Sequence, residues 1–399
     1  MIIDYLAYLL SLEPKGIKLG LERTEQLLHM CGDPQNTFTS IQVIGTNGKG
    51  STSAMVANIL KVSDYKVGLY TSPHLTKINE RIRINGNAIS DNEIIMFLNQ
   101  YQSSIEQVDA SFFETMTALA VWYFSKEKVD IAILETGLGG RLDSITACNS
   151  SLLVCTSISK DHQHILGDTV EEIAYEKICA LKKNMLCISS NHQPSIKEVF
   201  NKHAALINAK IEYVKSNTNN QLINLNGAHQ LENQMLAIAT IQHLSKFKIG
   251  DKAIKKGLAS VSWPGRIQTI SDKPLILFDV AHNEQGLLSL CNFVESLNLS
   301  KDKILIIALQ KNKHLYSSVD AINSLFDCII STQTNVRNYL SANDVSKLFS
   351  PNKSSVILDP IEAIKYAKNN FNNQCIVIAG SHYLGPIISK EFKISFENI

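Results

Sequence analysis

The feature that most constrains the fold is an alternation of short apolar segments with longer amphipathic stretches. In the first two thirds of the chain, residues 41–44, 66–70, 131–134 and 152–157 are rich in Val, Ile and Leu, and helical patterns separate most of them. This order is typical of a parallel sheet with helices packed on its faces. We therefore predict an α/β fold.

A second alternation begins after Trp263-Pro264-Gly265, which interrupts the first one. Strands are expected at 275–280, 303–309, 328–331, 355–358 and 375–379, with a helical stretch after each of the first four. Pro and Gly together are strong signals of a break between elements. We therefore predict two domains, a parallel-sheet domain over residues 1–264 and a smaller, Rossmann-like α/β domain over residues 265–399.

Composition excludes several classes of protein. The chain has 399 residues with 38 Lys and Arg against 37 Asp and Glu, so a net charge of +1 provides no general attraction for nucleic acid or an anionic membrane. No apolar run approaches the roughly 20 residues of a membrane span. The eight cysteines form no CxxC pair and no zinc-type spacing, as expected for reduced thiols. We expect a cytoplasmic monomer with no nucleic-acid or membrane partner.

A glycine-rich segment joins the first predicted strand to a helix expected at 51–61. Its residues, which we take as candidates for binding a nucleotide, are Gly45, Thr46, Asn47, Gly48, Lys49, Gly50 and Ser51. Backbone N–H groups at a helix start attract phosphate, and a lysine adds a positive charge. The segment departs from the strict GxxxxGK[ST] pattern, because Gly50 separates Lys49 from Ser51. A glycine-rich turn that binds nothing is the alternative, but the strand–loop–helix context favours a P-loop-type ATPase domain.

This loop and Thr71-Ser-Pro-His-Leu75 together resemble the folylpolyglutamate synthase and dihydrofolate synthase branch of the Mur ligase superfamily. Further segments match in the order of the family: Leu19-Gly-Leu-Glu-Arg23, Glu135-Thr-Gly-Leu-Gly-Gly-Arg-Leu-Asp143, Asp161-His162 with Leu166-Gly167, Glu176-Lys177, Pro264-Gly-Arg-Ile-Gln268 and Asp279-Val-Ala-His-Asn283. Ordered motifs are more specific than any single one. The resemblance implies both of the domains predicted above.

Magnesium is the metal that these residues favour. Glu135 ends a buried strand, where open α/β sheets bind ligands, and carboxylate oxygen suits Mg²⁺. A solvated strand-end acid is the alternative. The resemblance implies that Ser72, Glu135 and His162 hold one Mg²⁺ and that Ser51 lies near a second one bound to the nucleotide. His162 and His164 find no third zinc ligand at a fitting spacing, and imidazole is an unusual Mg²⁺ ligand, so the role of His162 depends on the resemblance.

Lys177 is expected in a helix over 170–182, where a lysine is usually solvated. The resemblance implies instead that CO₂ carbamylates it, which turns a cation into an anion able to bind or orient Mg²⁺. The family usually continues Lys-Ala-Gly, whereas Ile178-Cys179-Ala180 follows here.

Four more residues are expected at the nucleotide. By family position Asn233 helps to seat ATP from a helix that begins near 227, whose alternative is a capped surface helix. Arg266 follows the predicted domain boundary and is expected to reach the transferred phosphate only when the domains close; a linker charge is the alternative. Asp279 and His282 end a predicted strand of the second domain and are assigned to ATP by the resemblance. Glu284 stands where the family usually has proline.

The pterin ring is expected to meet residues from three segments. The resemblance implies Gly20 and Leu21 from the first motif, an aromatic contact from Phe113, and polar contacts from Arg141 and Asp143. Arg-Leu-Asp after Gly-Gly is common in the members that also make dihydrofolate, so a bifunctional enzyme is predicted. Phe113 as plain core and Asp143 as a turn cap are the alternatives.

The predicted function is an ATP-dependent amide ligase that joins L-glutamate to dihydropteroate and to reduced folates through an acyl phosphate. The residues expected in catalysis are Lys49, His162, Lys177 and Arg266. The rival predictions are a sister Mur-type ligase for a cell-wall peptide and a non-catalytic, nucleotide-binding regulatory protein.

Overall fold

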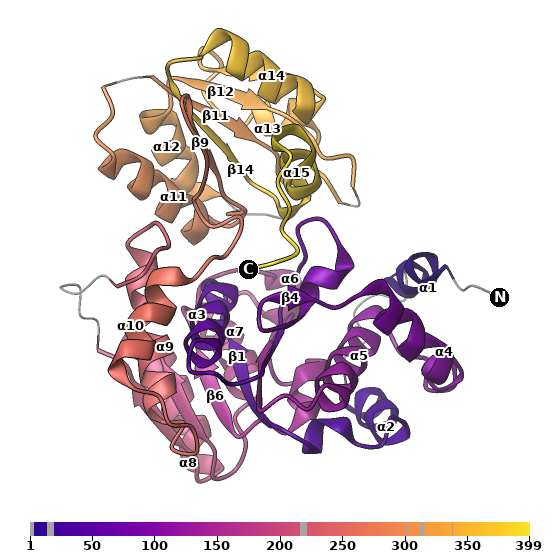
Figure 1. The fold of residues 1–399 in the computed structure, drawn as a ribbon. Coiled ribbons are helices and arrows are strands. Elements are labelled where there is room, and N and C mark those ends of the chain that lie inside the picture. The colour runs from indigo at the N-terminus through magenta and orange to yellow at the C-terminus, as the bar shows by residue number, and fades with distance from the viewer. Residues whose placement is uncertain (1–3, 14–19, 216–221, 301, 312–314, 337) are drawn as a thin grey trace.

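Two separate β-sheets, one for each predicted alternation, organise the chain in the computed structural model (Figure 1). The structure describes residues 4–13, 20–215, 222–300, 302–311, 315–336 and 338–399. The prediction of an α/β fold with a nucleotide-binding type of sheet followed by a smaller α/β unit is confirmed.

The first sheet has the strand order β4-β3-β2-β5-β1-β6-β7-β8. Its strands are β1 (Thr39–Ile44), β2 (Val67–Tyr70), β3 (Ile82–Ile84), β4 (Asn87–Ala88), β5 (Ile131–Glu135), β6 (Leu152–Cys155), β7 (Leu186–Ser189) and β8 (Lys210–Tyr213). All neighbours pair in parallel except β3, which runs antiparallel to β2 and β4. The central strands β5, β1 and β6 are mostly apolar and are buried on both faces, as expected for a parallel sheet.

Helices cover both faces of this sheet (Figure 1). They are α1 (Tyr5–Leu12), α2 (Glu22–Met30), α3 (Lys49–Lys61), α4 (Asp91–Gln107), α5 (Phe112–Lys126), α6 (Gln163–Leu166), α7 (Val170–Ile178), α8 (Pro194–Leu206), α9 (His229–Gln242) and α10 (Asp251–Ser260). Helices α3, α9 and α10 share one apolar core with the sheet, α1, α2, α4 and α5 share a second, and α7 and α8 a third. The phosphate-loop helix α3 is thus held between the sheet and two helices.

The second sheet has the order β13-β12-β11-β14-β10-β9. It contains β9 (Gln268–Asp272), β10 (Leu275–Phe278), β11 (Lys303–Ile307), β12 (Cys328–Ser331), β13 (Ser354–Val356) and β14 (Cys375–Ala379), with helices α11 (Glu284–Ser296), α12 (Tyr316–Leu325), α13 (Ala342–Ser346), α14 (Pro360–Asn370) and α15 (Gly385–Phe392). Only β9 is antiparallel to its neighbour. The sheet begins at Gln268, close to the predicted boundary, whose position at 264/265 stays a prediction.

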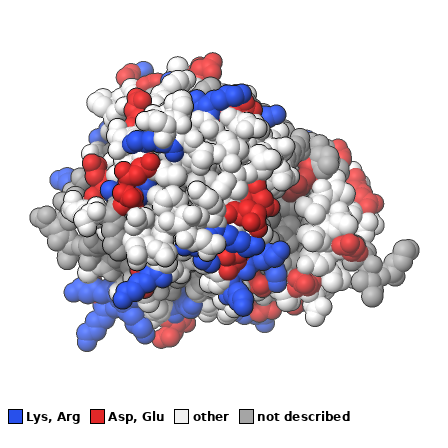
Figure 2. All heavy atoms as spheres, turned by 90° about the horizontal axis from the view of Figure 1, so that it is seen from above, with Lys and Arg blue, Asp and Glu red and all other residues white. Residues whose placement is uncertain are grey.

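Every strand predicted from the sequence is present, several with shifted ends. Helix α7 ends at Ile178, four residues before the predicted end. Sequence reasoning did not identify β3, β4, β7, β8 and β9. None of the helices in the described residues is both long and apolar enough to span a membrane. Figure 2 shows Lys and Arg interspersed with Asp and Glu on the face that it presents, as expected for a nearly neutral chain.

Candidate active site

The carboxyl ends of three neighbouring strands bring the candidate residues together. The register pairs Val43 of β1 with Glu135 of β5, and Leu134 of β5 with Tyr70 of β2. The phosphate loop after β1 and Ser72 after β2 therefore lie beside Glu135. This is the sheet edge at which open α/β folds bind ligands.

Two glycines of the phosphate loop tolerate no side chain. A Cβ atom on Gly45, whose φ is +143°, would lie 1.9 Å from Thr156 Oγ1. A Cβ atom on Gly48, whose φ is +88°, would lie 2.4 Å from Asn233 Oδ1. Because L-residues rarely adopt such φ values and both spaces are filled, glycine is required at each position.

Gly50 of the phosphate loop is in contact with Trp263, which lies next to the predicted domain boundary. A Cβ atom on Gly50 would lie 2.8 Å from Trp263 Nε1. On its other side the loop contacts α9, where Gln230 Nε2 donates to the buried Ser51 Oγ at 3.3 Å and Asn233 Nδ2 donates to Gln230 Oε1 at 2.9 Å. Asn233 thus lies against the phosphate loop, and its role in seating ATP stays a prediction.

Two lysines converge on one backbone carbonyl. Lys49 Nζ donates to Gly45 O at 3.2 Å and to Thr46 O at 3.1 Å, and Lys177 Nζ donates to Gly45 O at 2.8 Å. Lys177 is only 5% exposed, and its burial and the nearby Lys49 ammonium lower its pKa to about 7. Two amines that share one uncharged acceptor form a site suited to an anion.

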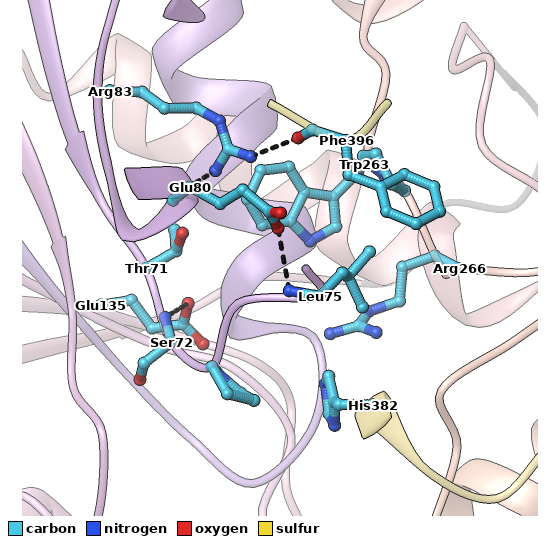
Figure 3. A pocket seen from close by; sticks show the side chains of 12 residues that line it. Thr71, Ser72, Leu75, Glu80, Arg83, Glu135, Trp263, Arg266, His382 and Phe396 are labelled. Carbon is cyan, nitrogen blue, oxygen red and sulfur yellow. Dashed lines mark hydrogen bonds between the residues drawn. The ribbon is translucent and has the colours of Figure 1, made fainter. Parts of the chain in front are cut away.

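The buried Glu135 and the half-buried Ser72 form an oxygen-rich pair opposite Arg266. Ser72 N donates to Glu135 Oε2 at 3.2 Å, and Arg266 lines the same narrow cavity (Figure 3). Burial raises the pKa of Glu135, and the charges of Lys49, Arg266 and Arg81 oppose that shift. Arg266 therefore already faces Glu135 in this arrangement of the two sheets.

The cavity is built by both halves of the chain. Its lining includes Leu75, Glu80 and Arg83 from the first sheet's domain and Trp263, His382 and Phe396 from beyond α10. These six residues, with Ser72, Glu135 and Arg266, place the candidate site between the two sheets.

The oxygen donors fit magnesium, which prefers oxygen ligands. The Glu135 carboxylate accepts from the backbone N–H of Ser72, and Ser51 lies in the first turn of the phosphate-loop helix. His162 does not line the cavity that Ser72 and Glu135 line. It precedes α6 with a φ of +51°, and its backbone N–H donates to Asp161 Oδ1 at 2.8 Å. Its role as a ligand stays a prediction.

Two of the predicted pterin contacts and one predicted Mg²⁺ ligand surround one glycine. A Cβ atom on Gly137 would lie 3.5 Å from Asp143 Oδ2, 3.6 Å from Ser72 Oγ and 3.9 Å from Phe113 Cδ1. Phe113 is 40% exposed, so it is not plain core. The Arg81 guanidinium lies 5.9 Å from the centre of the Phe113 ring. The Phe113 ring, the Asp143 carboxylate and the backbone of Gly137 therefore lie close together.

Asp143 also stabilises its own loop, which was the alternative to a pterin contact. Its Oδ2 accepts from Leu138 N at 2.9 Å, and its Oδ1 accepts from Ile145 N at 3.0 Å. Burial raises its pKa, and these hydrogen bonds oppose the shift. Arg141 forms an ion pair with Glu176 of α7 at 2.8 Å, so no contact places its guanidinium beside Phe113.

The family motif that contains Gly20, Leu21 and Arg23 lies near Phe113, because it leads into α2. Gly20 and Leu21 directly precede this helix, and Arg23 Nε donates to Glu114 Oε1 at 3.0 Å. Glu114 lies next to Phe113 in the first turn of α5. The start of α2 is thereby held against the helix that carries the predicted aromatic contact.

Comparison with known proteins decides the family. No protein-family model matches the chain. A dihydrofolate synthase/folylpolyglutamate synthase of Bacillus subtilis is 32% identical, over 95% of this chain and 96% of its own length. The chain belongs to the dihydrofolate synthase/folylpolyglutamate synthase family.

Solved structures of family members have the same fold. A folylpolyglutamate synthase of Thermotoga maritima is 29% identical, with a TM-score of 0.82 over 98% of this chain and 99% of that one. A folylpolyglutamate synthase solved with AMPPCP is 27% identical, with a TM-score of 0.83 over 98% of this chain and 99% of that one. The predicted resemblance is thus confirmed along the length of the chain.

The family motif 279–283 is held in place by hydrogen bonds to the backbone. Asp279 accepts from Ile267 N at 2.7 Å and from Ala281 N at 2.6 Å, so both of its carboxylate oxygens shape the surrounding backbone. His282 Nδ1 lies 2.9 Å from Val280 O. Their assignment to ATP stays a prediction.

Sequence reasoning missed the residues of this segment that contact the phosphate loop. Asn283 and Asn47 exchange amide hydrogen bonds of 3.0 and 3.3 Å, and Asn47 Nδ2 donates to Gln285 Oε1 at 2.9 Å. Asn283 Nδ2 also lies 3.1 Å from Asp161 Oδ2. The motif included Asn283, but nothing in the sequence indicated Gln285.

The low pKa of Lys177 gives a stability prediction. Its folded-state pKa of about 7 lies below the ordinary 10.5, so between these values the unfolded chain binds a proton that the folded chain does not. The free energy of unfolding of the wild type should therefore rise with pH in this window, relative to Lys177→Met. We expect the free energy of unfolding of the wild type, minus that of Lys177→Met, to rise from about pH 7 to about pH 10 in CO₂-free urea titrations. The exposed Lys183→Met serves as the control, and a constant difference for Lys177→Met would contradict the burial argument.

Proposed function

We propose that this chain is an ATP-dependent ligase that joins the amine of L-glutamate to the carboxylate of dihydropteroate and of reduced folates. The observation that carries the proposal is the convergence of Lys49 and Lys177 on the Gly45 carbonyl, beside the Ser72–Glu135 pair. The Bacillus subtilis relative bears both activities in its name.

The phosphate loop is proposed to hold the phosphates of ATP. The N–H groups that begin α3 point to its N-terminal end, where the helix dipole favours an anion. Lys49 lies in the first turn and would exchange its two carbonyl acceptors for phosphate oxygens. Asn233 and Trp263 shape the loop through Gly48 and Gly50.

The reaction needs an activated carboxylate, because a carboxylate and an amine do not condense at neutral pH. A substrate carboxylate oxygen attacks the γ-phosphorus of ATP, ADP leaves with the electrons of the broken P–O bond, and an acyl phosphate forms. The glutamate amine then attacks the acyl carbon and releases phosphate. Arg266, which faces Glu135 across the cavity, would stabilise the negative charge that moves during both steps. The narrow cavity would limit hydrolysis of the acyl phosphate by water.

The proposed metal sites use the oxygen donors at this sheet edge. Ser72 and Glu135, with His162 by resemblance, would hold one Mg²⁺, and Ser51 would lie near a second one bound to the nucleotide. When bound, magnesium offsets charge on the transferred phosphoryl group.

Lys177 is proposed to carry a carbamate derived from CO₂. Only the neutral amine attacks CO₂, and a pKa of about 7 leaves much of Lys177 neutral near neutral pH. The modification would replace repulsion from Lys49 by attraction. The glycine that usually follows in the family is not needed for the backbone here, because Cys179 has an ordinary φ of −65° at the end of α7.

The pterin is proposed to bind beside Gly137, between the Phe113 ring and the Asp143 carboxylate, with Gly20, Leu21 and Arg141 nearby by resemblance. Asp143 Oδ2 could accept from ring N–H groups as well as from Leu138 N. Use of dihydropteroate as well as reduced folates follows from this contact. A cytoplasmic monomer remains our expectation from charge and thiol content.

The experiment that tests the function is ADP release with dihydropteroate, tetrahydrofolate or a muramyl peptide, each with and without glutamate. We expect glutamate-dependent release with the two pteridines. Lys49→Ala should abolish it while the chain stays folded, since Lys49 is a charge beside transferred phosphate. Lys66→Ala, on the surface, is the matched control. Release only with the muramyl peptide would indicate the sister ligase, and ATP binding without release would indicate a regulatory protein.

The carbamate has a separate test. After CO₂ is stripped from the buffer, wild-type turnover should fall, and bicarbonate should restore it. Lys177→Ala should have low turnover that bicarbonate does not change. Normal turnover together with an unmodified Lys177 in the intact mass would show that this chain works without the carbamate.

Asp143→Asn tests the pterin contact while keeping an oxygen for the turn. Loss of a charged hydrogen-bond partner costs about 1.5–3 kcal/mol, or roughly tenfold to a hundredfold in kcat/KM. We expect this loss with dihydropteroate and a smaller one with tetrahydrofolate. Equal losses on both substrates would leave Asp143 with the structural role alone.

A further inference from the structure

Residues 393–399 follow α15 and run from the second sheet's domain to the first one (Figure 1). We call this segment the strap. Phe396 is 1% exposed and packs in the core of the second sheet, with its ring 6.4 Å from that of Phe278. Three residues later, Ile399 packs against the core around α3, and its N–H donates to Gly86 O at 3.0 Å. The strap therefore joins the cores of both domains.

Arg83 of β3 is the main polar contact of the strap. Its Nη2 donates to Phe396 O at 2.8 Å and its Nε to Glu397 O at 3.2 Å, while Nη1 donates to Glu80 O. The side chain is buried, and that burial lowers its pKa to about 10. A buried guanidinium is costly to leave without acceptors, so removal of the strap carbonyls would force this side chain to move.

Arg83 also contacts the residue that lies on the phosphate loop. Its guanidinium carbon lies 5.5 Å from the centre of the Trp263 ring, and Figure 3 shows Arg83, Trp263 and Phe396 together at one side of the cavity. A cation at this distance is attracted by an indole ring. Trp263 in turn fills the space beside Gly50, where a Cβ atom would lie 2.8 Å from its Nε1.

We propose that the strap and Arg83 are positioning elements for the nucleotide site. The strap carbonyls hold Arg83, Arg83 holds the Trp263 ring, and the ring sets the path of the phosphate loop at Gly50. The position of the second domain is thereby linked to nucleotide affinity. This inference rests on the proposed function, since it requires a nucleotide at the phosphate loop. The amide pair of Asn47 and Asn283 is a separate contact between the domains, so a link through Trp263 can be tested independently.

A double-mutant cycle on the dissociation constant of ADP tests this link. The variants are a chain that ends at Ile394, Arg83→Lys, Trp263→Leu, and the two combinations with Trp263→Leu. Lysine keeps the charge of Arg83 but cannot donate to two carbonyls and cover a ring at once. We expect strap removal and Arg83→Lys each to weaken ADP binding about fivefold or more in the wild-type background, and to have no further effect with Trp263→Leu.

Lys77→Gln is the matched control, because it removes the exposed ion pair with Glu397 and leaves the strap carbonyls in place. It should bind ADP as the wild type does. Thermal unfolding shows whether the shortened chain folds. If it does not, the cycle of Arg83→Lys with Trp263→Leu tests the link, because these variants keep the strap and Phe396. If the wild type binds ADP but the effects of the two changes on its dissociation constant simply add, the proposed link through Trp263 is overturned. A wild type that binds no ADP would overturn the proposed function itself.

Discussion

The candidate site depends on one shared hydrogen-bond acceptor, the carbonyl of Gly45. Lys49 and Lys177 both donate to it, although they come from different helices and Lys177 is buried. A neutral carbonyl offsets only part of two positive charges, so the arrangement is incomplete without an anion. Phosphate groups on one side and a carbamate on the other are the anions that we propose there.

The surrounding structure keeps this carbonyl in place. The side chain of Thr156 fills the space that a Cβ atom of Gly45 would need. The side chains of Asn233 and Trp263 fill the corresponding spaces beside Gly48 and Gly50. Thr156 directly follows β6, Asn233 belongs to α9, and Trp263 lies next to the predicted boundary between the domains. The phosphate loop is therefore shaped by distant parts of the chain, which explains how a domain movement could change it.

Local patterns predicted the phosphate loop and most of the buried strands, though not β7, because strong apolar runs and glycine spacing are properties of neighbouring residues. The same patterns missed β8 and β9, which are partly exposed edge strands with polar residues. Local sequence patterns also could not predict contacts between residues that lie far apart in the sequence. Gln285 reaches Asn47 only after folding, and Asp143 could be a turn cap, a ligand contact or both. Sequence spacing carries no distance between elements that lie hundreds of residues apart.

The central claim is that the carboxylate of the pteridine substrate attacks ATP at this site. Dihydropteroate labelled with oxygen-18 in its carboxylate tests it most directly, by mass analysis of the phosphate released during glutamate-dependent turnover. An acyl phosphate transfers one labelled oxygen to that phosphate, and this is the result that we predict. Unlabelled phosphate, with all of the label kept in the amide product and unreacted substrate, would contradict the account.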